Sequence, residues 1–184
     1  ADEKVSVSVE LFDEKSDAIN VQTKIVGKNQ SLSPLVVMTP KSGWWTCTSE
    51  RGGGITIWLN AMRYLSKIQP NRSVIFTANT GHELSHLGLD HFLKKNPSLV
   101  KNAFNWVHLG ANFAAKGGHV LWQASTNEYT EKGLGQLEDL NFVEISSCPI
   151  SSRPLGEARN IYDGGGQFIS LLGSNPLFHH PKDI

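Results

Sequence analysis

The chain has 184 residues, 39% of them hydrophobic, and its 17 basic residues balance 17 acidic ones. This length supports one sizeable core but not two full domains, so we expect a single domain over residues 1–184. The balanced charge contains no run of five like charges, which excludes binding to nucleic acid by bulk electrostatics. We also expect no membrane span, because no apolar run approaches the roughly 18 residues that a span requires.

Processing and redox signals leave the compartment open. The first residues, Ala1 to Val9, alternate polar and apolar side chains and do not form the apolar block of a signal peptide. Two cysteines, Cys47 and Cys148, permit at most one disulfide and exclude both a disulfide scaffold and a four-cysteine zinc site.

Two segments with alternating apolar residues open the chain. The first runs from Val5 to Leu11 and the second from Ile19 to Ile25. A period of two is typical of strands with one exposed face, so the pair predicts an antiparallel hairpin.

Short continuous apolar runs follow, and these are typical of strands that are covered on both faces. They are Leu35–Met38, Val74–Phe76, Trp106–Val107 and Gln167–Leu172. Between the first two, Ile55, Leu59, Met62 and Leu65 recur at helical spacing after three glycines, which predicts an amphipathic helix that ends before Pro70.

Three further helices are predicted at 83–95, 97–104 and 130–140. A strand, a helix and a second strand in succession imply a right-handed crossover between parallel strands. The expected fold is therefore a three-layer α/β/α arrangement around a mixed, mostly parallel sheet.

The segment His82-Glu83-Leu84-Ser85-His86 fits the pattern H-E-x-x-H. In zinc proteases of that type, two histidines on one helix bind the metal and the glutamate activates water. Here a strand-like run over 73–78 leads into Asn79-Thr80-Gly81, so His82 lies at best on the first turn of a helix. The helical context that the pattern needs is missing, and we keep this interpretation as a second alternative.

Taken as strand, loop and helix start, the segment Phe76–Gly88 resembles the zinc aminopeptidase family of the bacterial leucyl aminopeptidase type, which also includes the glutaminyl cyclases. In that family a strand ends in a Glu-Glu pair, whose first member is the general base and whose second is a metal ligand. The resemblance places His82 at the position of the base and Glu83 at that of the ligand.

The resemblance continues in the same order along nearly the whole chain. Thr39 stands where the family has a metal-binding histidine, Glu50 where it has a bridging aspartate, and Gly110 where it has a ligand aspartate. The segment Phe178-His-His-Pro-Lys-Asp183 resembles the final His-Thr-Pro-x-Asp, which retains a ligand in His179.

The resemblance implies a zinc-exopeptidase-like fold, of the phosphorylase/hydrolase-like type, with one zinc ion at most. Glu50, Glu83 and His179 would hold that ion, as in the single-zinc glutaminyl cyclases, and His82 would be the candidate catalytic residue. Trp44 and Trp45 follow a strand end near the expected crevice, where they could line a substrate pocket or pack as core residues. The expected ligand is a peptide or an amino-acid-like small molecule.

Three functional hypotheses follow. The first is a pseudoenzyme with a binding or structural role, because one metal site and the usual glutamate base are lost. The second is an active single-zinc hydrolase or cyclase that uses Glu50, Glu83 and His179, and the third is the H-E-x-x-H protease. The resemblance favours an extracellular or periplasmic location and leaves open whether the domain is part of a larger protein.

Overall fold

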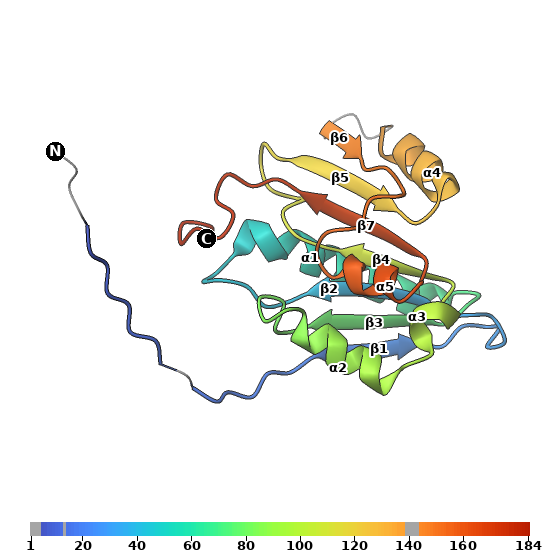
Figure 1. Cartoon of the computed structure of the whole chain (residues 1–184). Helices are drawn as coiled ribbons and strands as arrows, with labels where there is room; N and C mark the ends of the chain where they lie inside the picture. Colours follow the sequence, from blue (N-terminus) through green and yellow to red (C-terminus); the bar gives the residue numbers. More distant parts are fainter. Residues whose placement is uncertain (1–4, 13, 139–143) are drawn as a thin grey trace.

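A seven-stranded sheet forms the centre of the computed structural model, which describes residues 5–12, 14–138 and 144–184. Its strands lie in the order β1-β3-β2-β4-β7-β5-β6 (Figure 1). The bounds are β1 Val21–Ile25, β2 Leu35–Pro40, β3 Val74–Asn79, β4 Asn105–Leu109, β5 His119–Ala124, β6 Glu144–Ser147 and β7 Phe168–Gly173. Only β1 against β3 and β5 against β7 pair antiparallel, so the mixed, mostly parallel sheet is confirmed.

Helices cover both faces of this sheet, which confirms the three-layer arrangement. On one face α1 (Thr48–Ile68) packs through Trp58 against Phe76 and Val37. The other face carries α2 (Leu87–Lys95), α3 (Leu99–Asn102) and α5 (Ala158–Asp163), as Figure 1 shows. A further helix, α4 (Asn127–Glu138), lies beside β5 and β6. None of the described helices is both long and apolar enough to cross a membrane.

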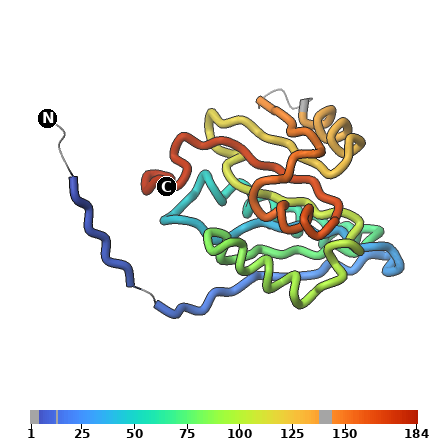
Figure 2. The backbone as a smooth tube through the Cα atoms, viewed as in Figure 1, coloured from blue at the N-terminus to red at the C-terminus, as the bar shows by residue number. Residues whose placement is uncertain are grey.

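The predicted hairpin at the start of the chain is wrong. Residues 21–25 do form a strand, but β1 pairs with β3, with Val21 opposite Ala78. The segment 5–11 runs away from the sheet (Figure 2), and its apolar side chains at Val5 and Leu11 are 84% and 87% exposed. Alternation indicates an extended backbone, but it does not identify the partner strand.

The four central strands and the long helix are confirmed. Helix α1 starts earlier than expected, at Thr48, and includes the three glycines. Close packing explains why a glycine stands at position 54 of this helix. A Cβ there would lie 2.7 Å from Oγ1 of Thr39 and 2.8 Å from the carbonyl oxygen of Leu109. The glycine lets the first turns of α1 approach the carboxyl ends of β2 and β4.

The remaining helices are shorter than expected or begin elsewhere. The predicted helix over 83–95 begins only at Leu87, because Ser85 and His86 have φ values of 56° and 65°. The helix expected over 97–104 is reduced to α3, and α4 begins ahead of the predicted start, while Leu140 lies outside the described residues. The sequence analysis did not identify β5, β6 or α5.

Candidate functional site

The three predicted metal ligands come from separate segments that meet at the carboxyl edge of the parallel strands. Glu50 lies in the first turn of α1, Glu83 follows β3, and His179 belongs to the turns after β7. Glu50 is 1% exposed, and Nε2 of His179 lies 3.5 Å from its Oε1. Arg51 contacts both Glu50 and Glu83, and His179 joins this group through Glu50.

Arg51 provides the cation that joins the two carboxylates. Its Nη2 lies 2.8 Å from Oε1 of Glu50 and donates a hydrogen bond of 2.7 Å to Oε1 of Glu83. Its Nε donates to the carbonyl oxygen of Ser42 at 2.6 Å, and the side chain is only 3% exposed. Among the described residues, no three His, Cys, Asp or Glu side chains are grouped as a metal ion requires. The side chains present therefore fit a guanidinium better than a zinc ion.

Electrostatics at Glu83 reflects this pairing. Burial alone would raise the pKa of the Glu83 carboxyl, but the hydrogen bond from Arg51 and the positive charge behind it outweigh burial, so the pKa lies below its ordinary value. Ser42 also donates to Oε2 of Glu83, at 3.1 Å. Glu83 is therefore an ionised partner of Arg51 at neutral pH.

Asp183 anchors the segment after β7 to the start of α1. Its carboxylate accepts hydrogen bonds from the backbone N–H groups of Ser49, at 2.7 Å, and Glu50, at 3.0 Å. Burial by itself would raise the pKa of Asp183. The hydrogen bonds from these N–H groups lower it by more, so the pKa lies below its ordinary value. The carboxylate caps the positive end of the helix, which fixes the turn carrying His179 beside Glu50.

The two strand ends that the resemblance assigns to a second metal ion, at Thr39 and Gly110, are closely packed. The hydroxyl of Thr39 is fully buried and donates to the carbonyl oxygen of Leu109 at 2.8 Å. Gly110 carries no side chain, and a Cβ there would lie 2.9 Å from the carbonyl oxygen of Leu171. These two positions provide neither a free ligand nor space for one.

His82 belongs to a chain of buried polar groups. The Thr77 hydroxyl donates to Oδ1 of Asn79 at 2.7 Å, and Nδ2 of Asn79 donates to Oε2 of Glu157 at 2.9 Å. The other oxygen of Glu157 lies 3.3 Å from Nδ1 of His82. Glu157 is fully buried, so it holds the imidazole in one orientation.

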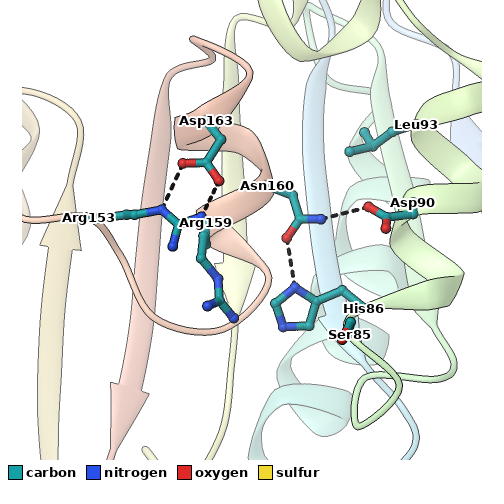
Figure 3. Close-up of a pocket in the computed structure, with 8 residues that line it drawn as sticks. All are labelled: Ser85, His86, Asp90, Leu93, Arg153, Arg159, Asn160 and Asp163. Carbon is teal, nitrogen blue, oxygen red and sulfur yellow. Dashed lines mark hydrogen bonds and ion pairs between the residues drawn. The ribbon is translucent and has the colours of Figure 1, made fainter.

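The H-E-x-x-H segment does not lie on a helix, as a zinc protease of that type would require. Residues 82–86 form successive turns, and α2 starts only after them. His86 is tied to α5, with Nδ1 at 2.7 Å from Oδ1 of Asn160, whose Nδ2 donates to Asp90 (Figure 3). Burial lowers the pKa of His86, which keeps the ring neutral near pH 7. Glu83, which would have to activate water in such a protease, is bound to Arg51 instead.

Two cavities lie on either side of the two imidazoles, whose ring centres are 4.8 Å apart. The cavity in Figure 3, about 400 Å³, is lined by His86 together with polar and charged side chains such as Arg159. The other, about 390 Å³, is lined by His82, Asn112 and apolar side chains that include Leu172 and Phe178. The second cavity combines an apolar wall with the side chain of Asn112, whose backbone N–H donates to the carbonyl oxygen of Glu50.

Trp44 and Trp45 lie in the loop between β2 and α1. The Trp44 ring meets the His179 ring edge-on, with ring centres 6.5 Å apart. Both tryptophans are largely solvent-exposed, at 51% and 62%. Their exposure rules out the alternative of core packing, and their role in substrate binding stays a prediction.

Arg51, Asn112 and Glu157 are the site residues that sequence reasoning missed. None of the three was singled out as a functional residue. No sequence signal pointed to Arg51, because the helix was expected to begin only after the three glycines that follow it. Asn112 has a φ of 66°, which no local pattern predicted.

The fold and the edge described above define a zinc-aminopeptidase-like α/β domain. The profile of Peptidase family M28 matches residues 49–136, slightly less than half of the chain. This match confirms the resemblance to the zinc aminopeptidases. No curated protein matches the chain at the level of sequence.

Solved structures of bacterial aminopeptidases share the fold. BSAP, a zinc aminopeptidase from Bacillus subtilis, superposes with a TM-score of 0.73 at 16% identity, covering 89% of this chain and 44% of its own. The aminopeptidase from Aneurinibacillus sp. strain AM-1 gives 0.69 at 14% identity over 89% and 42%. LapB from Legionella pneumophila gives 0.64 at 15% identity over 90% and 49%. The chain thus spans less than half the length of these proteins.

Proposed function

We propose that this domain binds an amino-acid-like or peptide-like molecule at its carboxyl edge and has lost the two-metal hydrolysis typical of aminopeptidases. The observation that carries this proposal is the close packing of α1 at Gly54 against Thr39 and Leu109. A second metal ion needs side-chain ligands from the ends of β2 and β4. One of these ends is committed to a buried hydrogen bond, and the other is a glycine.

The cavity beside His82 supports the ligand class. Asn112 is 5% exposed, and its Oδ1 has no hydrogen-bond partner among the described residues, although it is a strong acceptor. A ligand that donates an N–H to this oxygen would satisfy it, since an unpaired buried acceptor is costly. Leu172 and Phe178 provide an apolar wall for the rest of the ligand. An amine or amide next to an apolar side chain has this combination of groups.

A second candidate function is favoured by the pairing of His82 with Glu157. An imidazole held by a buried carboxylate is the arrangement of an oriented general base. On this basis the domain would be an active hydrolase or cyclase, with one zinc ion at most. Turnover separates this candidate from the binding role.

The test uses the purified chain. We expect leucinamide and Leu-Gly to shift amide NMR signals around Asn112, without release of 4-nitroaniline from leucine 4-nitroanilide or cyclisation of an N-terminal glutamine. Asn112→Gly removes the amide and accepts the positive φ, so it should weaken binding about tenfold or more. Asn60→Ala, on the exposed surface of α1, is the matched control. Turnover that depends on His82 would establish the second candidate instead, and absence of both binding and turnover would contradict both.

A further inference from the structure

We propose that the guanidinium of Arg51 has taken the place of the remaining metal ion as the cation that holds Glu50, Glu83 and His179 together. The inference concerns the same edge as the proposed function, but it does not depend on whether a ligand binds there. It turns the expected zinc site into a permanent ion-pair cluster built from the chain's own side chains.

The Arg51 guanidinium lies where a shared metal ion would lie. One atom, Nη2 of Arg51, contacts one oxygen of each carboxylate, at 2.8 Å for Glu50 and 2.7 Å for Glu83. A metal shared by two monodentate carboxylates would have to occupy the same space between these oxygens. His179 Nε2 then completes the set at 3.5 Å from Glu50. The cation and the expected ion therefore compete for one position.

The Arg51 side chain is buried and fixed in this position. The Arg51 side chain is 3% exposed, and its Nε is fixed by the 2.6 Å hydrogen bond to the Ser42 carbonyl oxygen. A surface arginine could turn away into water when a metal arrives. This one donates hydrogen bonds to Ser42 and Glu83 and forms an ion pair with Glu50, and it would have to leave a buried position, which its charge makes costly. A divalent ion that entered without displacing it would meet a positive charge at contact distance.

The position of Arg51 near the start of α1 is unfavourable for a positive charge. Arg51 lies in the first turn of α1, where the dipole disfavours a positive side chain. A guanidinium, unlike an imidazole or a lysine ammonium, never loses its proton in a protein and offers a planar fork for carboxylates. It can therefore serve as a constant counter-charge for two carboxylates at every physiological pH. The pairing accounts for an arginine that its helix alone would not favour.

The test compares zinc binding by the chain and its variants, measured by isothermal titration calorimetry and by the melting temperature. The unmodified chain, treated with a chelator and then titrated with ZnCl₂, should bind no zinc at the site and keep the same Tm. Arg51→Ala removes the cation between the two carboxylates, so zinc should bind at the site about a hundredfold more tightly than the detection limit that the unmodified chain sets. At a free zinc concentration a hundred times Kd, the Tm of this variant should rise by about 5–10 °C.

Two controls make the result specific to this site. Arg63→Ala, an exposed arginine of the same helix, should behave like the unmodified chain. The double variant R51A/E83Q should lose the gained zinc affinity. Stoichiometric zinc binding by the unmodified chain that E83Q abolishes would overturn the inference, and so would a folded Arg51→Ala that binds no zinc. Should Arg51→Ala fail to fold, zinc titrations of the unmodified chain and of Glu83→Gln still test the inference. The outcome of these zinc titrations is independent of the NMR test of ligand binding.

Discussion

The carboxylate of Asp183 accepts a hydrogen bond from the backbone N–H of Glu50, so the segment after β7 fixes the helix turn that carries the buried glutamate. Residues 133 positions apart are joined by this contact. Because Asp183 is 2% exposed, the cap is protected from solvent, and the arrangement of the site depends on it.

Removing this cap should destabilise the domain. Asp183→Ala deletes the acceptor for two backbone N–H groups, and we expect a loss of about 1–2 kcal/mol in the free energy of unfolding. Asp183→Asn keeps one acceptor oxygen and should lose less. Urea unfolding followed by circular dichroism measures both, with the exposed Asp163→Ala as the control. Equal stability of Asp183→Ala and the unmodified chain would contradict the capping role.

The pairing of His82 and Glu157 should be measurable as a coupling. Glu157→Gln and His82→Asn should each destabilise the domain by about 1–3 kcal/mol, because each leaves a buried hydrogen-bonding group without its partner. The double variant should lose less than the sum of the two. In ¹⁵N-resolved NMR spectra, the Nδ1–H tautomer of His82 should dominate in the unmodified chain and lose its preference in Glu157→Gln. Additive losses would show that the two residues act independently.

Stability should fall with acidification because of His108. Burial lowers the pKa of His108 to about 3, and electrostatic repulsion from His82, His86 and Arg51 adds to the shift. The unfolded chain, with a histidine pKa of about 6.5, binds more protons between these values, so stability rises with pH across this range. From pH 7 to pH 5 the loss should be about 2 kcal/mol.

The check is a series of unfolding curves at several pH values. His108→Asn preserves a polar atom near Ser170, the partner of Nδ1 at 2.8 Å, but does not titrate. This variant should show a flatter pH dependence between pH 5 and pH 7. A slope identical to that of the unmodified chain would assign the acid sensitivity to other groups.

Two glycines in helices should respond to alanine in opposite directions. At Gly54 a Cβ would lie 2.7 Å from Oγ1 of Thr39, so Gly54→Ala should displace α1 and cost about 1–3 kcal/mol. At Gly135, in α4, a Cβ meets nothing within 4 Å, and alanine should stabilise the helix by about 0.5–1 kcal/mol. Thermal unfolding distinguishes the two, and a neutral Gly54→Ala would contradict the close approach.

The fold class was predictable because the buried strands are continuous apolar runs and the apolar residues of α1 recur at helical spacing over many turns. Sequence reasoning missed α5, whose six residues are too short for a helical period to be visible. The prediction paired segment 19–25 with segment 5–11, whereas the true neighbour of β1 is β3, about fifty positions later. A local sequence pattern thus predicts whether a segment is a strand or a helix more reliably than it predicts which strand pairs with it.

The site was predictable only in part for a related reason. The resemblance to the zinc aminopeptidases implied that Glu50, Glu83 and His179 would meet at one edge, and the fold places both glutamates against Arg51 and His179 beside Glu50. That an arginine would lie between them could not be derived from spacing, because Arg51 and Glu83 are separated by 32 positions. The pairing of Glu157 with His82 depends on α5, which was not predicted.

The glycine at position 110 affects how this domain could evolve. A Cβ there would lie 2.9 Å from the carbonyl oxygen of Leu171, in the backbone of the adjacent strand, which cannot give way as a side chain would. Replacing that glycine by aspartate alone would distort the sheet before it supplied a ligand, and Thr39 would have to change as well. A second metal ligand at this edge would therefore require coordinated changes at both positions and in the strand beside them, and a single substitution would not supply it.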